Sequence, residues 1–195
     1  MIDKLPDDFG RHKIFRCWIP QGRVHQTGAT PPRPGIRLAK VDKIIVGDTG
    51  RRGLRAVEAA RDIGQAYGHF LIDHDAIVEC IPALTSSMGL VEQAAFVKPI
   101  RGQTLTAQES AIAVNLCFGG GIAATEMYAR CVALVAFLCD RFELSPDKDV
   151  KGASELDRAR KDPETALREA GASLSKLVQD VAARLNDISA SRRSA

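Results

Sequence analysis

The chain has 195 residues, of which 45% are hydrophobic, so it can bury a core. This length predicts one domain rather than two. Charged residues make up 26% of the chain and the net charge is +3, which indicates no general affinity for nucleic acid or for a membrane surface. The sequence lacks a signal-peptide pattern and any apolar run of the roughly 20 residues that a membrane-spanning helix needs, so we expect a soluble protein.

The first 40 residues are rich in proline, glycine and arginine. Their stretch PQGRVHQTGATPPRPGIR predicts neither a long helix nor a central strand, because proline lacks a backbone donor and both proline and glycine favour turns. We expect an N-terminal arm that either wraps the domain in an ordered way or is loose. Its arginines, Arg23, Arg33 and Arg37, either contact phosphate or carboxylate groups or are simply solvated.

A strand and a helix are predicted directly after this arm. VDKIIV is a β-branched run that predicts a buried strand over 41–46, and Gly47-Asp48-Thr49-Gly50 predicts its exit loop. Apolar residues at helical spacing then predict a helix over 53–63, with Gly64 as its stop.

A hairpin and another strand follow. HFLIDHDAIVECIP has two apolar runs on either side of Asp73-His74-Asp75-Ala76, which is the pattern of a β-hairpin. AIAVNLCF predicts a strand over 111–118, while residues 83–110 show so little periodicity that we expect a loop with short helical turns.

Two helices are predicted toward the C-terminus. The apolar residues from Met127 to Phe142 fall on one helical face, and those from Leu167 to Ile188 recur at steps of three and four. The second pattern predicts one helical seam, which either packs on its own domain or offers a contact for an oligomer or another protein. The five cysteines contain no Cys-x-x-Cys pair, and we interpret them as reduced core residues.

The order of these elements predicts the α/β class, with a small mixed central β-sheet flanked by helices. We divide the chain into the N-terminal arm (1–40), a domain (41–163) and a C-terminal helix and tail (164–195). Element order specifies no chemistry, so function has to be argued from particular residues.

Four segments carry a resemblance to a known family: KIIVGDTG, AYGHFLIDHDAIVECIP, AIAVNLCFGGG and VKGASELDRARKDP. From about Lys43 to Pro163 the chain resembles the zinc-dependent N-acetylmuramoyl-L-alanine amidases, which include phage lysozyme-amidases, cytoplasmic anhydromuropeptide amidases and peptidoglycan recognition proteins. The resemblance implies a central sheet, a groove with zinc at one end, and cleavage of the amide between N-acetylmuramic acid and L-alanine. Such a zinc needs three protein ligands and one open position for water.

By position, the resemblance places the family's three zinc ligands at Gly47, Gly152 and Asp162. Only Asp162 carries a donor atom, and a single carboxylate cannot retain zinc. We therefore expect no bound cofactor, although the family holds zinc.

Other positions that the resemblance implies are altered too. A tyrosine of phage members is replaced by Gly68, with Tyr67 displaced by one residue. An acid that some members carry is replaced by Asn115, whose amide cannot act as a general base. The basic residue that helps to stabilise the oxyanion in phage members is represented by Arg160, with Lys161 beside it.

A metal site rebuilt from other residues would need Asp48, His69, His74 and Asp162. Asp48 follows the ligand position directly, so on a strand it points to the opposite face. His69 matches a family histidine that is usually structural, and it is either a satisfied core histidine or a groove contact. His74 belongs to a solvated turn, and no histidine follows it in the chain.

These residues indicate a catalytically degenerate amidase-like domain that binds a peptidoglycan fragment or muropeptide, or that serves as an interaction module. The alternatives are a structural or assembly protein of a prophage tail or secretion apparatus, and an active zinc amidase. We expect the protein to be cytoplasmic, or released without a signal peptide as phage wall enzymes are. The residues expected to line the groove are Gly47, Asp48, Thr49, His69, Asn115, Gly152, Arg160, Lys161 and Asp162.

Overall fold

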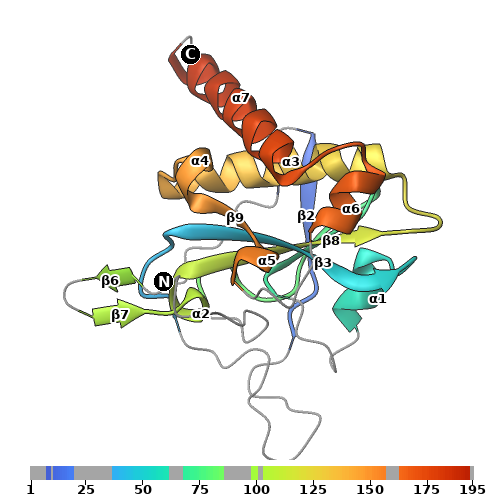
Figure 1. Cartoon of the computed structure of the whole chain (residues 1–195), viewed down its shortest axis with the longest axis horizontal. Coiled ribbons are helices and arrows are strands. Elements are labelled where there is room, and N and C mark those ends of the chain that lie inside the picture. The colour runs from blue at the N-terminus through green and yellow to red at the C-terminus, as the bar shows by residue number, and fades with distance from the viewer. Residues whose placement is uncertain are drawn as a thin grey trace, which may run out of the picture.

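A seven-stranded mixed sheet forms the centre of the protein in a computed structural model, which describes residues 8–9, 11–19, 37–61, 68–85, 98–100, 103–156 and 163–193 (Figure 1). The hairpin pair β4–β5 and the edge pair β1–β2 are antiparallel, and the other neighbouring strands are parallel. The predicted α/β class, the mixed sheet and the hairpin are therefore confirmed. In sheet order the strands are β1 (Asp8–Phe9), β2 (His12–Arg16), β5 (Ile77–Glu79), β4 (Phe70–Ile72), β8 (Ala111–Phe118), β3 (Lys43–Arg52) and β9 (Val150–Gly152).

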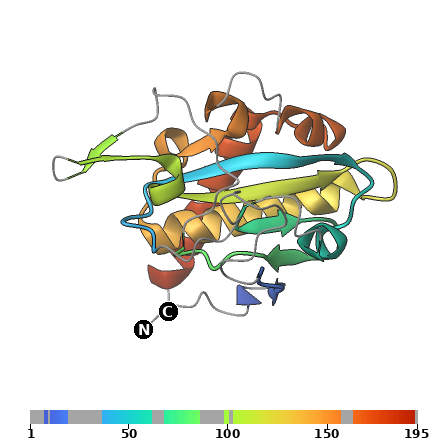
Figure 2. The ribbon, with the colours of Figure 1, turned by 90° about the horizontal axis from the view of Figure 1, so that it is seen from below.

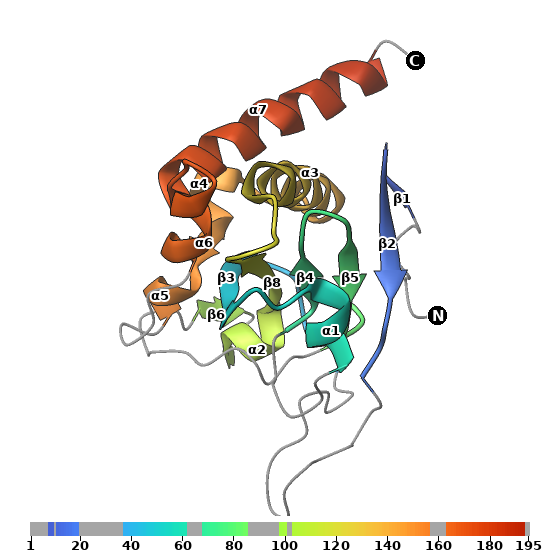
Figure 3. The ribbon, with the colours of Figure 1, turned by 90° about the vertical axis from the view of Figure 1, so that its right-hand side faces the viewer.

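Helices cover both faces of this sheet (Figures 1 and 3). Helices α3 (Ala124–Phe142), α6 (Glu164–Glu169) and α7 (Leu174–Arg193) pack on one face, which we call the α3 face. Helices α1 (Ala56–Arg61), α2 (Ala107–Ser110) and α5 (Ala153–Leu156) pack on the other, which we call the α1 face. The short helix α4 (Pro146–Asp149) leads from α3 into β9.

The central strand β8 shows why both faces are dry. Ile112, Val114 and Leu116 belong to the core cluster of the α3 face, whereas the alternating Ala113 and Cys117 belong to the clusters of the α1 face. Every residue of β8 is buried, as expected for a strand covered on both sides. Figure 2 shows β3 and β8 running side by side through the middle of the sheet.

Part of the predicted N-terminal arm joins the sheet, because β2 pairs in parallel with β5. The Glu79 carboxylate at the end of β5 is only 2% exposed, and it accepts hydrogen bonds from Arg16 Nε at 3.0 Å and Trp18 Nε1 at 3.1 Å. A buried carboxylate needs such partners, and here they fasten the first strand to the hairpin. Arg37 forms an isolated bridge with Thr85, and Arg23 and Arg33 lie outside the described residues.

The prediction of one continuous helix from Leu167 to Ile188 is wrong. The chain forms α6, breaks at Gly171 with φ +71°, and begins α7 at Leu174. Glycine adopts this left-handed conformation at little cost, which is why a helix ends there. Both halves of the seam still pack on their own domain, since Leu167, Leu177 and Val181 are fully buried in the α3-face core.

Smaller differences concern the loops. Within residues 83–110, which we expected to be a loop with helical turns, the described parts contain the short antiparallel pair β6 (Lys98–Ile100) and β7 (Gln103–Leu105) as well as α2. β3 continues to Arg52, and α1 begins only at Ala56.

The cysteines in this structure are free thiols. Four are buried and Cys17 is half-buried; burial raises the pKa of the Cys131 and Cys139 thiols to about 12. None of the described helices combines the length and apolar character needed to cross a bilayer.

Candidate functional site

The candidate site lies on the α1 face, where β3 and β8 run side by side. Gly47 of β3 is in register with Asn115 of β8, and Leu71 of β4 flanks Asn115 on its other side. One apolar cluster on this face contains Leu71 and Cys117 with α1, and a second contains Ile45 and Ala113 with α2 and α5. Gly47 and Asn115 lie between the two clusters, at the positions where the resemblance implies a ligand and an acid.

Asn115 is buried with an unused hydrogen-bond donor. The residue is 5% exposed, and its Nδ2 has no hydrogen-bond partner among the residues that the structure describes. A buried amide N–H without a partner costs about 1–3 kcal/mol, so such a group usually has a reason to be there. An acceptor on a ligand, such as a carbonyl oxygen, would satisfy it.

Gly68 packs directly against this strand. Its φ is +117°, and a Cβ placed there would lie 2.6 Å from Ala113 Cβ and 3.0 Å from Asn115 Nδ2. No side chain fits at this position, so the tyrosine that the resemblance would place here has no room in this backbone.

Gly68→Ala is accordingly expected to destabilise the protein by about 2 kcal/mol, through the positive φ and the clash with Ala113. Urea unfolding followed by circular dichroism measures this. Gly120→Ala is the matched control, because that glycine has no positive φ and nothing within 4 Å of an added Cβ. Equal effects of the two substitutions would contradict the packing described for Gly68.

The residues described do not fit a zinc ion of the family's type. Gly47 has no side chain, and Asn115 offers only a neutral amide. Gly152 of β9 pairs with Val46, and a Cβ on it would point to Leu174 Cδ2 at 3.1 Å and Pro163 Cδ at 3.2 Å, which lie on the α3 face. Within the described ranges no group of three or more His, Cys, Asp or Glu side chains is arranged to hold a metal.

Asp48 and Thr49 shape the irregular end of β3. Asp48 is in register with Leu116 and therefore points to the α3 face, and its Oδ1 accepts a hydrogen bond from Gly50 N at 2.9 Å. Thr49 Oγ1 donates to the Arg51 carbonyl oxygen at 3.1 Å. Both side chains are buried, at 8% and 6% exposed, and both support the local turn.

His69 is a satisfied core histidine. Its Nδ1 accepts a hydrogen bond from Ala113 N at 2.9 Å, so Nε2 carries the proton and donates to the Thr85 carbonyl oxygen at 2.7 Å. The side chain is 0% exposed, and burial lowers the pKa of His69 to about 4. The ring is neutral at pH 7 and joins β8 to the loop after β5, with no ring nitrogen left for a ligand.

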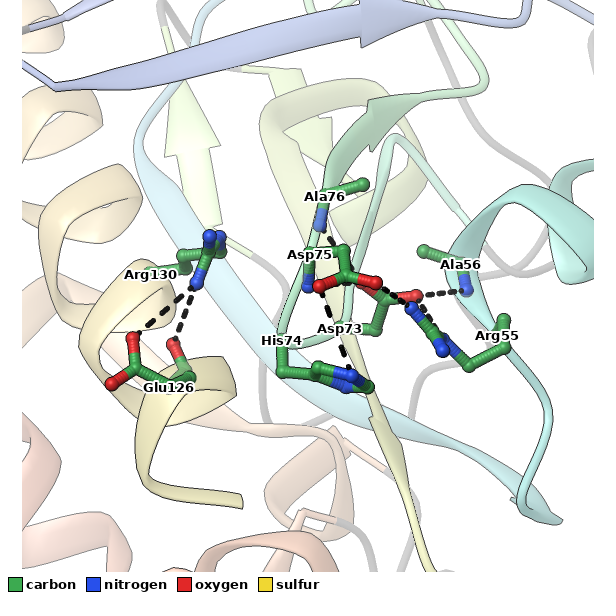
Figure 4. A network of polar contacts seen from close by, with 8 residues as sticks. All are labelled: Arg55, Ala56, Asp73, His74, Asp75, Ala76, Glu126 and Arg130. Atoms are coloured by element: carbon green, nitrogen blue, oxygen red, sulfur yellow. Dashed lines mark hydrogen bonds and ion pairs between the residues drawn. The ribbon is translucent and has the colours of Figure 1, made fainter. Parts of the chain in front are cut away.

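Asp73, predicted only as part of a hairpin turn, is a central polar residue of the structure. Its carboxylate is 1% exposed and accepts hydrogen bonds from Ala56 N at 3.0 Å, Asp75 N at 2.7 Å and Ala76 N at 2.8 Å (Figure 4). Arg55 Nε donates to it at 2.8 Å, and Arg55 also pairs with Asp75. An aspartate that accepts a hydrogen bond from the backbone N–H two residues later is a common turn feature, and the sequence suggests it here. The contact between Asp73 and the start of α1 depends on the tertiary fold and could not be read from the sequence.

The remaining predicted site residues, Arg160, Lys161 and Asp162, lie outside the described residues, as does Tyr67.

The overall fold matches several solved structures, among them an endolysin and a hydrolase. The catalytic domain of XlyA superposes with a TM-score of 0.64 at 17% identity, covering 87% of this chain and 99% of that one. A mutant endolysin from Bacillus subtilis gives 0.62 at 18% identity, with 87% and 99% covered. The hydrolase AmiA from Staphylococcus aureus, solved in complex with its ligand, gives 0.62 at 16% identity, with 89% and 83% covered.

No family model matches the chain, and no curated protein matches it. At 18% identity or less the structural likeness concerns the fold alone. The chain therefore has the amidase and endolysin fold that its sequence resemblance implied.

Proposed function

We propose that this domain binds a peptidoglycan fragment, an N-acetylmuramoyl peptide, without hydrolysing it. The observation that carries the proposal is the side-by-side placement of Gly47 and Asn115 on the α1 face. Glycine has no side-chain atom to hold a cation, and an amide neither activates water nor holds zinc as a carboxylate or imidazole does. The proposed function is therefore that of a binding module that needs no zinc.

The chemistry of Asn115 suits such a ligand. Muropeptides contain a series of amide carbonyl groups, and each can accept a hydrogen bond from the unpartnered Nδ2. Binding would satisfy a donor that the free protein leaves buried. A role in ligand binding is supported by the matched hydrolase AmiA, a protein of the same fold that was solved in complex with its ligand.

Binding is expected in a pull-down with purified sacculi and in calorimetry with muropeptides. Asn115→Ala should weaken the muropeptide affinity by roughly fivefold or more, because a hydrogen bond to a buried donor is lost. Asn186→Ala, an exposed asparagine on α7, should leave the affinity unchanged. No retention on sacculi together with no heat from muropeptides would refute the proposal.

The same preparations test the alternative of an active zinc amidase. We expect the purified protein to contain far less than one zinc per chain and to release no L-alanine-terminated peptides from sacculi. Stoichiometric zinc with peptide release would establish the active enzyme instead, with ligands drawn from residues outside those described here.

The assembly alternative depended on two features, the arginine- and proline-rich N-terminal arm, much of which lies outside the described residues, and the seam from Leu167 to Ile188. Its buried members, Leu167, Leu177 and Val181, are accounted for by packing inside the domain. Leu185 and Ile188 are only partly buried, which leaves the second half of α7 as the surface for any oligomer contact. Binding of a peptidoglycan fragment is therefore the function that the residues support best.

A further inference from the structure

A groove of about 500 Å³ lies on the α3 side of the molecule, away from Gly47 and Asn115. Its lining comes from β2 and the residue before it, from α3 and from α7: Arg11, His12, Tyr128, Ala129, Val132, Ala133, Asp180 and Arg184. Figures 1 and 3 show α7 crossing α3 obliquely, with β2 standing beside them. Its volume is within the range of small-molecule sites.

The floor of the groove is apolar. Ala129, Val132 and Ala133 of α3 contribute methyl groups, and the half-buried ring of Tyr128 adds an aromatic surface. A ligand with a ring or a short hydrocarbon part would cover this surface and remove it from water.

The rim is cationic. Arg11, next to β2, and Arg184 of α7 both line it, and Arg130 of α3 is close enough for its charge to act on His12. The pKa of His12 is lowered first by burial and then by the charges of three arginines, Arg11, Arg130 and Arg184, against a smaller opposite effect of Glu126. The pair Arg130–Glu126 is long, at 3.7 Å, and so is Arg184–Asp187, at 3.9 Å. Arg11 and Arg184 therefore place two cations on the groove against one lining carboxylate, that of Asp180.

Asp180 is the one carboxylate among the groove-lining residues named above, and other partners occupy it. Tyr128 Oη donates to its Oδ2 at 2.7 Å, and Lys176 Nζ pairs with its Oδ1. The contact with Lys176, which has the larger effect, and the contact with Tyr128 both lower the pKa of Asp180. Arg184 pairs with Asp187 only at 3.9 Å, so an anion that approaches more closely, such as a phosphate, can compete for its guanidinium group.

We propose that this groove is a second binding site, for a small organic phosphate with an apolar or aromatic part. A guanidinium group offers paired N–H donors that match the oxygens of a phosphate, and two such groups face the same space from different elements. The apolar floor holds the organic part. This site is independent of the peptidoglycan-binding proposal, because it lies on the other side of the sheet.

Calorimetry with phenyl phosphate, inorganic phosphate, citrate and an oligoglutamate peptide tests the assignment. Phenyl phosphate should bind with one-to-one stoichiometry and more tightly than inorganic phosphate. The backbone amide NMR signals of the protein that shift when phenyl phosphate is added should be those of Tyr128, Ala129 and Ala133. Arg184→Gln should weaken binding by roughly tenfold, since a charge-assisted contact is lost. Asp180→Asn should tighten binding, because it removes a negative charge and releases Lys176.

Arg61→Gln, an exposed arginine of α1, is the control for a general change of charge and should leave the affinity unchanged. Arg11→Gln repeats the test on the β2 side if Arg184→Gln does not fold. Binding of citrate or of the peptide in place of phenyl phosphate would overturn the assignment. So would equal weakening by Arg61→Gln and Arg184→Gln, or no binding by any of the four probes.

Discussion

Replacing Asp73 with alanine is expected to destabilise the protein by about 3–5 kcal/mol, as removal of one partner from a buried ionic network does. The substitution leaves the N–H groups of Ala56 and Ala76 buried without an acceptor, and it leaves Arg55 without its buried partner. It also disconnects the start of α1 from the β4–β5 hairpin. Urea unfolding at pH 7, followed by circular dichroism, measures the loss.

Asp75→Ala is the matched control, because the same Arg55 pairs with Asp75, but its side chain is 67% exposed. Exposed pairs contribute about 0–1 kcal/mol, so the control should change little. Equal effects of the two substitutions would contradict the role assigned to Asp73.

The Asp73 contacts also predict a dependence on pH. Burial alone would raise the pKa of Asp73, but the hydrogen bonds from Arg55 and from three backbone N–H groups outweigh it and lower that pKa. A carboxyl with a lowered pKa in the folded state contributes stability above its unfolded pKa of about 3.9, and this contribution is lost as the pH falls further. The free energy of unfolding of the wild-type protein should therefore fall below pH 4 as Asp73 takes up a proton. Asp73→Asn should lack this part of the pH dependence, because asparagine does not titrate.

The strands were predictable because their residues are β-branched or apolar and recur in runs. AIAVNLCF forms β8 as predicted, over the predicted residues 111–118. The hairpin was predictable for the same reason, since two apolar runs flank a polar turn. The short strands β6 and β7 were not, because three residues are too few to show any period.

The break between α6 and α7 shows a limit of periodicity. Residues Gly171 to Ser173 interrupt the helix, yet Leu167, Leu174 and Leu177 remain at the spacing of one continuous face. An apolar pattern indicates which side chains face the core. Two consecutive helices that pack on the same core can show the same spacing of apolar residues as one continuous helix. Gly171 itself was the available stop signal.

At the candidate site, the strand pattern was only partly informative. It placed Asn115 inside a strand, and alternation placed Asp48 on the opposite face from Gly47, but Gly47 to Gly50 were predicted as an exit loop and instead belong to β3. That Gly152 points to the α3 face depends on the register between β9 and β3, a long-range pairing. The interactions of Asp73 with α1 are long-range as well, since they join residues 17 and 18 positions apart.

His69 predicts the second large effect, a loss of stability in mildly acidic solution. The pKa of this histidine is lowered to about 4 in the folded protein, while an unfolded histidine has a pKa of about 6.5. The unfolded chain therefore takes up a proton at a higher pH than the folded chain does. The contribution of neutral His69 to the free energy of unfolding is complete above about pH 6.5. Below that it falls by about 1.4 kcal/mol per pH unit, and near pH 4 the loss amounts to about 3 kcal/mol.

Urea unfolding between pH 7 and pH 4 measures this slope, and His69→Gln should reduce it because glutamine does not titrate. The window lies above that of Asp73, so the two groups can be separated. NMR of the wild-type ring gives a readout that requires no variant. It should show the proton on Nε2, since Nδ1 accepts from Ala113, and no titration of the ring near pH 6. A ring that titrates near pH 6.5 would mean that His69 is open to solvent, and it would then again be available to the groove as a ligand contact.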